Sequence, residues 1–114
     1  MIVMAEARLA AGIWVAAYLR RLGLANIPAY VTRHGDDTAG SVMVKCATLD
    51  GRAALWLREW DFQTDLRPWS RVNEAGEAEI DAQIARQTGR DPDLWVIEIE
   101  SRDGRTLLDQ EGLV

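Results

Sequence analysis

One stretch of the chain decides the fold, and it reads Ser41-Val42-Met43-Val44-Lys45-Cys46-Ala47-Thr48-Leu49-Asp50-Gly51-Arg52-Ala53-Ala54-Leu55-Trp56-Leu57-Arg58-Glu59-Trp60. Apolar residues alternate along residues 41–49 and again along residues 52–60, a pattern that is typical of strands. The dipeptide Asp50-Gly51 between them is a strong signal for a tight β-hairpin. The stretch therefore predicts two antiparallel strands joined by a short turn.

The segments on either side of this hairpin predict two more strands and two helices. Ala29–Arg33 is rich in strand-forming residues, and Leu94–Glu100 alternates apolar and acidic side chains. Ala11–Leu22 and Glu77–Gln87 carry apolar residues at helical spacing. Asp61–Gly76 reads as an irregular connection. The predicted order is α-β-β-β-α-β.

These elements predict a single α+β domain over residues 1–114. Consecutive hairpins favour an antiparallel sheet of four strands, or of five if Thr106–Leu108 pairs back at its edge, and we expect the two helices to cover one face. The covered face is expected to carry Val42, Val44, Leu55, Leu57, Trp95, Ile97 and Ile99. The open face is expected to carry Met43, Lys45, Trp56, Arg58, Trp60, Val96, Glu98 and Glu100.

The composition argues against several kinds of function. The net charge of -5 disfavours nucleic-acid binding, which draws on many Lys and Arg side chains, and Lys45 is the only lysine. Cys46 is the only cysteine and reads as a core residue, so the chain has no internal disulfide and no cysteine-rich zinc site. His34 is the only histidine, and any Ser-His or Cys-His chemistry would have to use it. The sequence predicts no metal site, no cofactor and no catalytic residue.

The most apolar run, Leu9–Leu19, covers about half of the roughly 20 residues that a membrane-spanning helix needs. Glu6 stands before it, where a signal peptide would carry positive charge. We therefore expect a cytoplasmic protein without a membrane contact. Met4 is an alternative start to Met1.

A polar loop after the first predicted strand provides an alternative site. Arg33-His34-Gly35 resembles the signature of histidine phosphatases, whose mechanism needs a second histidine that this chain lacks. The glycine-bounded loop also carries Asp36 and Asp37, which would repel a phosphate. Arg33, His34, Asp36 and Asp37 are the residues that a small ligand or a small enzyme active site would use. A connecting loop explains them as well, in which case His34→Ala leaves fold and function intact.

Three motifs together resemble the domain-of-unknown-function family 1491, which is found mainly in alphaproteobacteria. They are Ile13-Trp14-Val15-Ala16-Ala17-Tyr18-Leu19-Arg20-Arg21, then Gly40-Ser41-Val42-Met43-Val44-Lys45 with Leu49-Asp50-Gly51, and Asp91-Pro92-Asp93-Leu94-Trp95-Val96-Ile97-Glu98-Ile99-Glu100 with Arg102-Asp103-Gly104-Arg105. The resemblance spans nearly the whole chain and implies a small bacterial cytoplasmic protein. The family has no assigned activity, so the resemblance carries over no catalytic residue.

The leading functional hypothesis is a protein-interaction module, with a homodimer as one form, that binds through the open sheet face. Trp56, Arg58, Trp60 and Lys45 are its expected binding residues, because Trp and Arg are enriched at binding hot spots. In the alternative arrangement, the 61–76 segment with Phe62 and Trp69 folds back over this face as a lid. The other functional alternatives are the small-ligand binder or small enzyme that uses the 33–40 loop, and a nucleic-acid binder.

Overall fold

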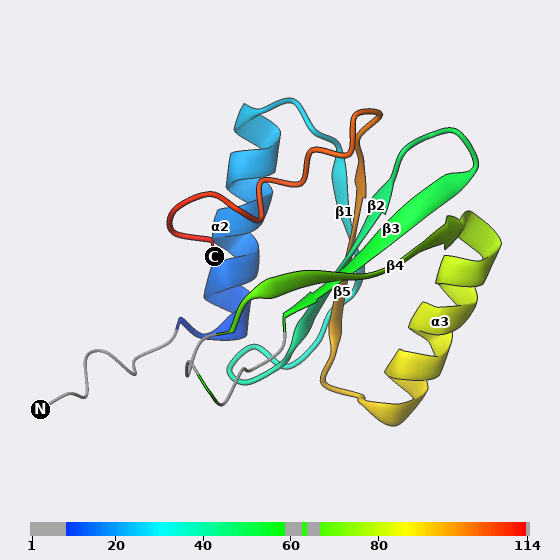
Figure 1. The fold of residues 1–114 in the computed structure, drawn as a ribbon. Coiled ribbons are helices and arrows are strands. Elements are labelled where there is room, and N and C mark those ends of the chain that lie inside the picture. The colour runs from blue at the N-terminus through cyan, green and yellow to red at the C-terminus, as the bar shows by residue number, and fades with distance from the viewer. Residues whose placement is uncertain (1–8, 59–62, 64–66, 114) are drawn as a thin grey trace, which may run out of the picture.

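A computed structural model describes residues 9–58, 63 and 67–113 of the chain. Two helices and five strands form one α+β unit (Figure 1). In chain order they are α2 (Ala11–Leu24), β1 (Ala29–Arg33), β2 (Val42–Ala47), β3 (Arg52–Arg58), β4 (Trp69–Gly76), α3 (Glu77–Arg90) and β5 (Trp95–Glu100). None of the helices within these described ranges is long and apolar enough to cross a membrane.

The sheet is mixed, with the strand order β1-β5-β2-β3-β4. β5 runs parallel to β2, and every other neighbouring pair is antiparallel. The predicted α+β class with two helices is confirmed. The predicted antiparallel sheet of four, or possibly five, strands is corrected to a mixed sheet of five, because α3 carries the chain from the outer strand β4 back to the middle of the sheet, where β5 runs parallel to β2. The fifth strand is β4, within the predicted irregular connection. Its residues are polar and mostly exposed, so it carries little apolar alternation.

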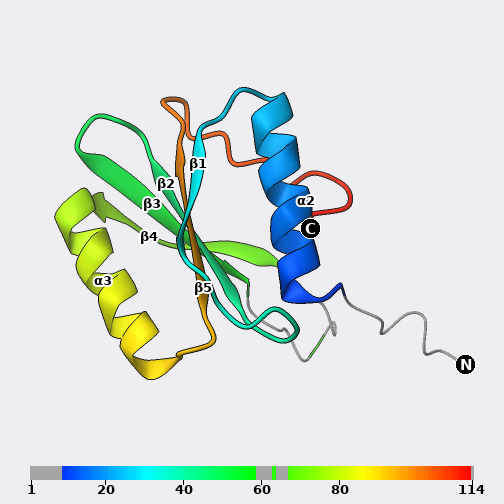
Figure 2. The ribbon, with the colours of Figure 1, turned by 180° about the vertical axis from the view of Figure 1, so that it is seen from behind.

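The two helices cover opposite faces of the sheet, whereas both were predicted on one face (Figures 1 and 2). α2 packs on a cluster that includes Val44, Cys46 and Ile97. Ile80 of α3 packs on a second cluster that includes Met43, Leu55 and Val96. β2 is consequently buried on both faces along its whole length.

The β2–β3 register also differs from the prediction, by one residue. A two-residue turn at Asp50-Gly51 would have brought Val44 opposite Leu57. The loop instead has three residues, Leu49 to Gly51, because the Thr48 N–H bonds the Arg52 carbonyl at 3.2 Å. Val44 therefore pairs with Trp56, and the side chains of β3 exchange faces relative to the prediction.

This one-residue shift corrects two assignments. Leu55 and Leu57 belong to the cluster under α3, on the face opposite Val44. Trp56 packs against the cluster under α2, so the face that carries it is not open. The predicted core positions Trp95, Ile97 and Ile99 are confirmed, and all three are buried under α2.

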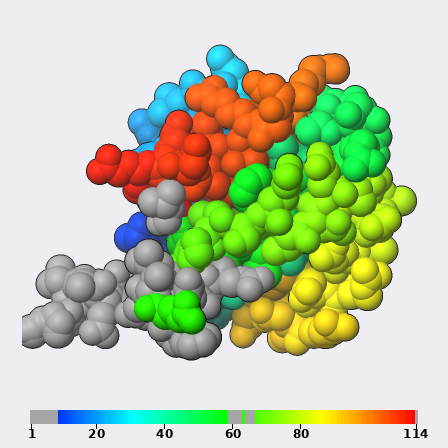
Figure 3. Space-filling model, viewed as in Figure 1, coloured from blue at the N-terminus to red at the C-terminus, as the bar shows by residue number. Residues whose placement is uncertain are grey.

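The segment after β5 closes the α2 side of the molecule. It runs back along α2 (Figure 1), and its last residues lie against that helix on the surface (Figure 3). Leu107, Leu108 and Leu113 are buried in the α2 cluster, and the Tyr18 hydroxyl donates to the Thr106 carbonyl at 2.9 Å. The expected edge strand at 106–108 does not form, and Leu107 and Leu108 pack in the α2 cluster through their side chains instead.

Candidate functional site

A guanidinium group packs against two neighbouring indole rings beside α2. Arg58, at the end of β3, places its Cζ atom 5.3 Å from the ring centroid of Trp14 and 4.8 Å from that of Trp69. Trp14 comes from α2 and Trp69 opens β4, so three separate elements build the cluster. Cations over aromatic faces attract at this range, and the attraction strengthens where water is excluded.

All three side chains donate to one backbone oxygen, the carbonyl of Leu113. Trp14 Nε1 lies 3.3 Å and Trp69 Nε1 lies 3.2 Å from it, and an Arg58 terminal nitrogen bonds it as well. The Leu113 side chain is completely buried in the α2 cluster. We call Trp14, Arg58 and Trp69 the carbonyl clamp.

A second arginine holds the same segment two residues earlier. Arg21, in the last turn of α2, donates to the Glu111 carbonyl at 2.6 Å. Gly112 has φ +90°, and a Cβ atom there would lie 2.6 Å from an Arg21 terminal nitrogen. Together these contacts hold the backbone carbonyls of Glu111 and Leu113 and the Leu113 side chain. The positive φ of residue 112 between them favours glycine.

The clamp has the chemistry of a peptide-binding site. Its donors are indole N–H and guanidinium groups, which recognise an acceptor oxygen but supply no nucleophile and no ordinary general base. Nowhere in residues 9–58, 63 and 67–113 do three His, Cys, Asp or Glu side chains gather as metal ligands.

The four residues predicted for the open face do not form one site. Arg58 belongs to the clamp, and Trp56 is half-buried beneath α2. Lys45 lies on the opposite face, under α3, and Trp60 lies outside the described residues. The alternative arrangement with a covering segment is met in part, because Trp69 joins the covered cluster, while Phe62 lies outside the described residues. Sequence reasoning missed Trp14 and Leu113 as site residues. The unusual number of tryptophans was the only signal for Trp14, and no sequence pattern pointed to Leu113.

Lys45 is the centre of an ion-pair network. Its ammonium group, 4% exposed, lies 2.8 Å from Asp81, 2.9 Å from Glu77 and 3.5 Å from Glu98. Burial alone would lower the pKa of Lys45, but hydrogen bonds to Asp81 and Glu77, with the charge of Glu98, raise it above its usual value. Lys45 is thus a fixed cation that ties the start of α3 to the sheet. Glu98 lies directly opposite Lys45 on the neighbouring parallel strand β5.

The 33–40 loop turns its polar groups onto itself and onto α2. His34 Nε2 lies 3.0 Å from Asp37, and the Asp36 carboxylate accepts the backbone N–H groups of Thr38 and Ala39. Arg33 donates to a backbone carbonyl, that of Pro92, at 3.2 Å.

The same loop caps the start of α2 with its carbonyls. The Asp37 carbonyl accepts the Gly12 N–H at 2.8 Å, and the Thr38 carbonyl accepts the Ala11 N–H at 3.2 Å. A phosphate cradle would present N–H groups instead, so this geometry fits a structural loop.

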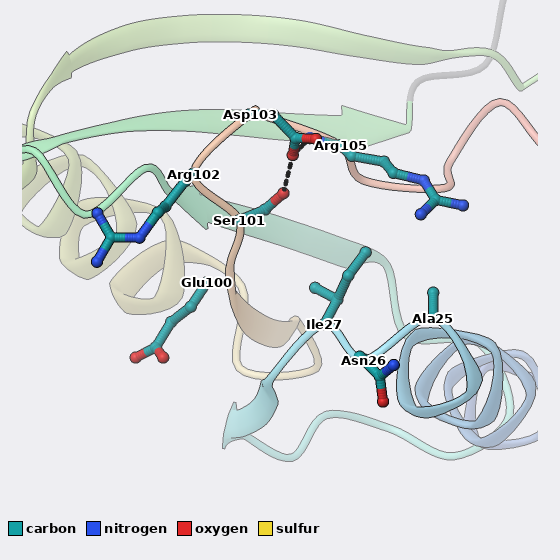
Figure 4. A pocket seen from close by; sticks show the side chains of 8 residues that line it. All are labelled: Ala25, Asn26, Ile27, Glu100, Ser101, Arg102, Asp103 and Arg105. Carbon is teal, nitrogen blue, oxygen red and sulfur yellow. Dashed lines mark hydrogen bonds between the residues drawn. The ribbon is translucent and has the colours of Figure 1, made fainter.

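A hollow of about 420 Å³ lies between the α2–β1 turn and the segment after β5 (Figure 4). Ser101 Oγ bonds Asp103 at 2.9 Å inside it, while Arg102 and Arg105 point in different directions (Figure 4). This hydrogen bond, together with one from the Arg105 N–H, lowers the pKa of Asp103. The polar groups bond one another, and no set of them converges on a ligand position.

A mixed five-stranded sheet with one helix on each face defines the class of small α+β domain to which the chain belongs. The chain is a member of the DUF1491 family, described as proteins of unknown function, whose pattern matches residues 9–109. The resemblance found in the sequence is thereby confirmed.

Solved structures of related proteins agree with this assignment. A crystal structure of a DUF1491 family protein from Caulobacter crescentus CB15 has 40% identity and a TM-score of 0.78, over 90% of this chain and 94% of that one. An NMR structure of a DUF1491 family protein from the same bacterium has 41% identity and a TM-score of 0.79, over 89% and 93%. Protein Atu0922 from A. tumefaciens has 30% identity and a TM-score of 0.70, over 83% and 87%. No curated protein matches the chain.

Proposed function

We propose that this protein is a cytoplasmic protein-interaction module that binds a peptide segment of its partner at the carbonyl clamp. One observation carries the proposal. Trp14, Arg58 and Trp69, from three elements, all donate hydrogen bonds to one peptide carbonyl, that of Leu113. The Leu113 side chain is fully buried. Trp and Arg in a partly desolvated pocket are the residues that dominate binding energies at protein interfaces. The buried, unpaired thiol of Cys46 suits the reducing conditions of the cytoplasm.

Binding to a free peptide tests this function. The peptide Asp-Gln-Glu-Gly-Leu-Val repeats residues 109–114, and the full-length variant Leu113→Glu cannot bury its own side chain in the pocket. We expect a fluorescein-labelled peptide to bind this variant saturably, measured by fluorescence anisotropy. Adding Arg58→Met to the variant should remove the binding. A folded Leu113→Glu protein, checked by circular dichroism, that fails to bind the peptide would refute the proposed function.

A second candidate function is self-association through the outer surface of α2. Ile13 and Leu24 of α2 expose 59% and 75% of their surface. They are eleven residues apart, about three helical turns, and so lie on one side of the helix, as in helix–helix contacts. Light scattering at increasing protein concentration tests it. A dimer that disappears in Ile13→Glu supports this candidate, and a monomer at every concentration contradicts it.

A further inference from the structure

The clamp is already occupied in this structure by the chain's own residues Gln110–Leu113, which we call the tail. The clamp residues all lie within residues 9–109, the stretch that matches the family, whereas Leu113 lies beyond it. Resting on the proposed function, we propose that the tail is a built-in competitor that closes the site. We further propose that the partner supplies an acidic segment with glycine followed by leucine.

The contacts of the tail define the chemistry of that segment. Glycine is favoured because residue 112 has φ +90°, a conformation that other residues adopt only with strain. Leucine is required because its side chain fills a fully buried position. Acidic neighbours suit the site because Arg21 and Arg58 flank it, and the tail region itself carries Asp109 and Glu111.

The tail can leave without opening the sheet. The backbone hydrogen bonds that its N–H groups donate are local turns, from the Gln110 N–H to the Leu107 carbonyl and from the Leu113 N–H to the Gln110 carbonyl, both at 3.0 Å. Leu107 and Leu108 stay anchored in the α2 cluster, so only the residues after them need to move. Opening the tail costs the hydrogen bonds of the clamp and of Arg21 and the burial of the Leu113 side chain, but it leaves the strand ladder of the sheet intact.

The tail and a free peptide compete for the same clamp, and the tethering of the tail determines how much weaker the peptide binds. A tethered tail acts at an effective concentration on the order of millimolar. A free peptide that binds the open clamp with a dissociation constant on the order of 100 μM would therefore bind the closed, wild-type protein about tenfold more weakly. The difference between the two proteins measures the tail alone.

The experiment compares full-length proteins with the same labelled peptide, Asp-Gln-Glu-Gly-Leu-Val, by anisotropy. We expect binding to Leu113→Glu to be about tenfold stronger than binding to the wild type. Leu49→Glu, the same change at an exposed leucine of the β2–β3 loop, should bind like the wild type. Gly112→Val, which strains the tail at a positive φ, is a second way to open the site and should act like Leu113→Glu. A peptide with alanine in place of glycine should lose most of its affinity.

Several outcomes would overturn this inference. Equal affinity for the wild type and both opened variants would show that the tail does not compete, even though the clamp binds peptides. An alanine-containing peptide that binds as well as the original would remove the glycine requirement. A wild-type dimer that Leu113→Glu abolishes would assign the tail to a second copy of the chain. Failure of the peptide to bind any folded variant would instead count against the proposed function itself.

Discussion

The indole rings of Trp14 and Trp69 lie 5.3 Å apart between centroids, at an interplanar angle of 32°, and both donate to the carbonyl oxygen of Leu113. One oxygen therefore joins α2, the start of β4 and the end of the chain. Because this oxygen is the shared acceptor, displacing the Leu113 segment removes a hydrogen bond from all three donors at once, whereas losing one donor leaves the oxygen bonded by the other two.

Arg58 should stabilise the fold as well as the site. Arg58→Met keeps much of the side-chain volume but loses the charged hydrogen bond and the contacts with two indole rings. We expect the free energy of unfolding to fall by about 2–3 kcal/mol, measured by urea denaturation. Arg52→Met, at the exposed other end of β3, is the matched control and should change it by less than about 0.5 kcal/mol. Similar losses in the two variants would mean that the clamp adds nothing to stability.

Lys45 should be essential for the docking of α3. Lys45→Met leaves the carboxylates of Glu77, Asp81 and Glu98 close together without their cation. Breaking a buried pair costs about 3–5 kcal/mol, and the partial exposure of the three acids brings the expected loss to about 2–3 kcal/mol. A methionine variant as stable as the wild type in urea at neutral pH would contradict this role.

The same ammonium group predicts an alkaline limit to stability. The pKa of Lys45 is raised in the folded protein, so its contribution is fully present below the unfolded value of about 10.4 and is lost as the pH rises through the folded value. The difference in unfolding free energy between the wild type and Lys45→Met should therefore stay constant from neutral pH to about pH 10 and shrink above it. A difference that shrinks between pH 7 and 9 would assign the effect to another group.

Cys46 should be unreactive in the folded protein. Burial, and then the negative charge of Asp103, raise the pKa of the Cys46 thiol to about 11. Since the thiolate is the reactive form, labelling with a disulfide reagent at pH 8 should proceed only through unfolding and slow by several orders of magnitude relative to urea-unfolded protein. The unfolded thiol loses its proton near pH 8.5, so this group lowers stability as the pH rises from there towards 11. Rapid labelling of the native protein at pH 8 would contradict the burial.

Local patterns in the sequence predicted both helices and four strands, because alternation and helical spacing are local properties. The register of β3 could not be predicted, since it depends on whether Leu49 joins the turn, and Leu49 does so at φ +63°, a conformation unusual for leucine. That one residue determines whether Trp56 or Leu57 lies under α2.

The site was less accessible to sequence reasoning than the fold. Arg58 and Lys45 were predicted as binding residues of one open face, whereas they lie on opposite faces of the sheet. The chain brings Arg58 next to Trp14, 44 positions earlier, and Leu113, 55 positions later, through tertiary packing alone. β4 escaped prediction because an edge strand with a polar sequence gives no periodic signal.

Trp95 should couple the 33–40 loop to the start of α2. Its Nε1 donates to the Asp36 carbonyl at 2.8 Å, and Cβ atoms at Gly35 or Gly40 would approach its ring within 3 Å. Carbonyl groups of the loop in turn accept hydrogen bonds from the Ala11 and Gly12 N–H groups.

Trp95→Phe keeps an aromatic ring but loses the hydrogen bond, so we expect the free energy of unfolding to fall by about 1–3 kcal/mol. We also expect the amide protons of Ala11 and Gly12 to exchange at least tenfold faster relative to those of β2, by NMR. Thr38→Ala changes an exposed side chain of the same loop, keeps the backbone carbonyl that accepts the Ala11 N–H, and should leave both measurements nearly unchanged. If Trp95→Phe speeds all amides equally, the tryptophan supports the core as a whole and holds no specific connection to α2.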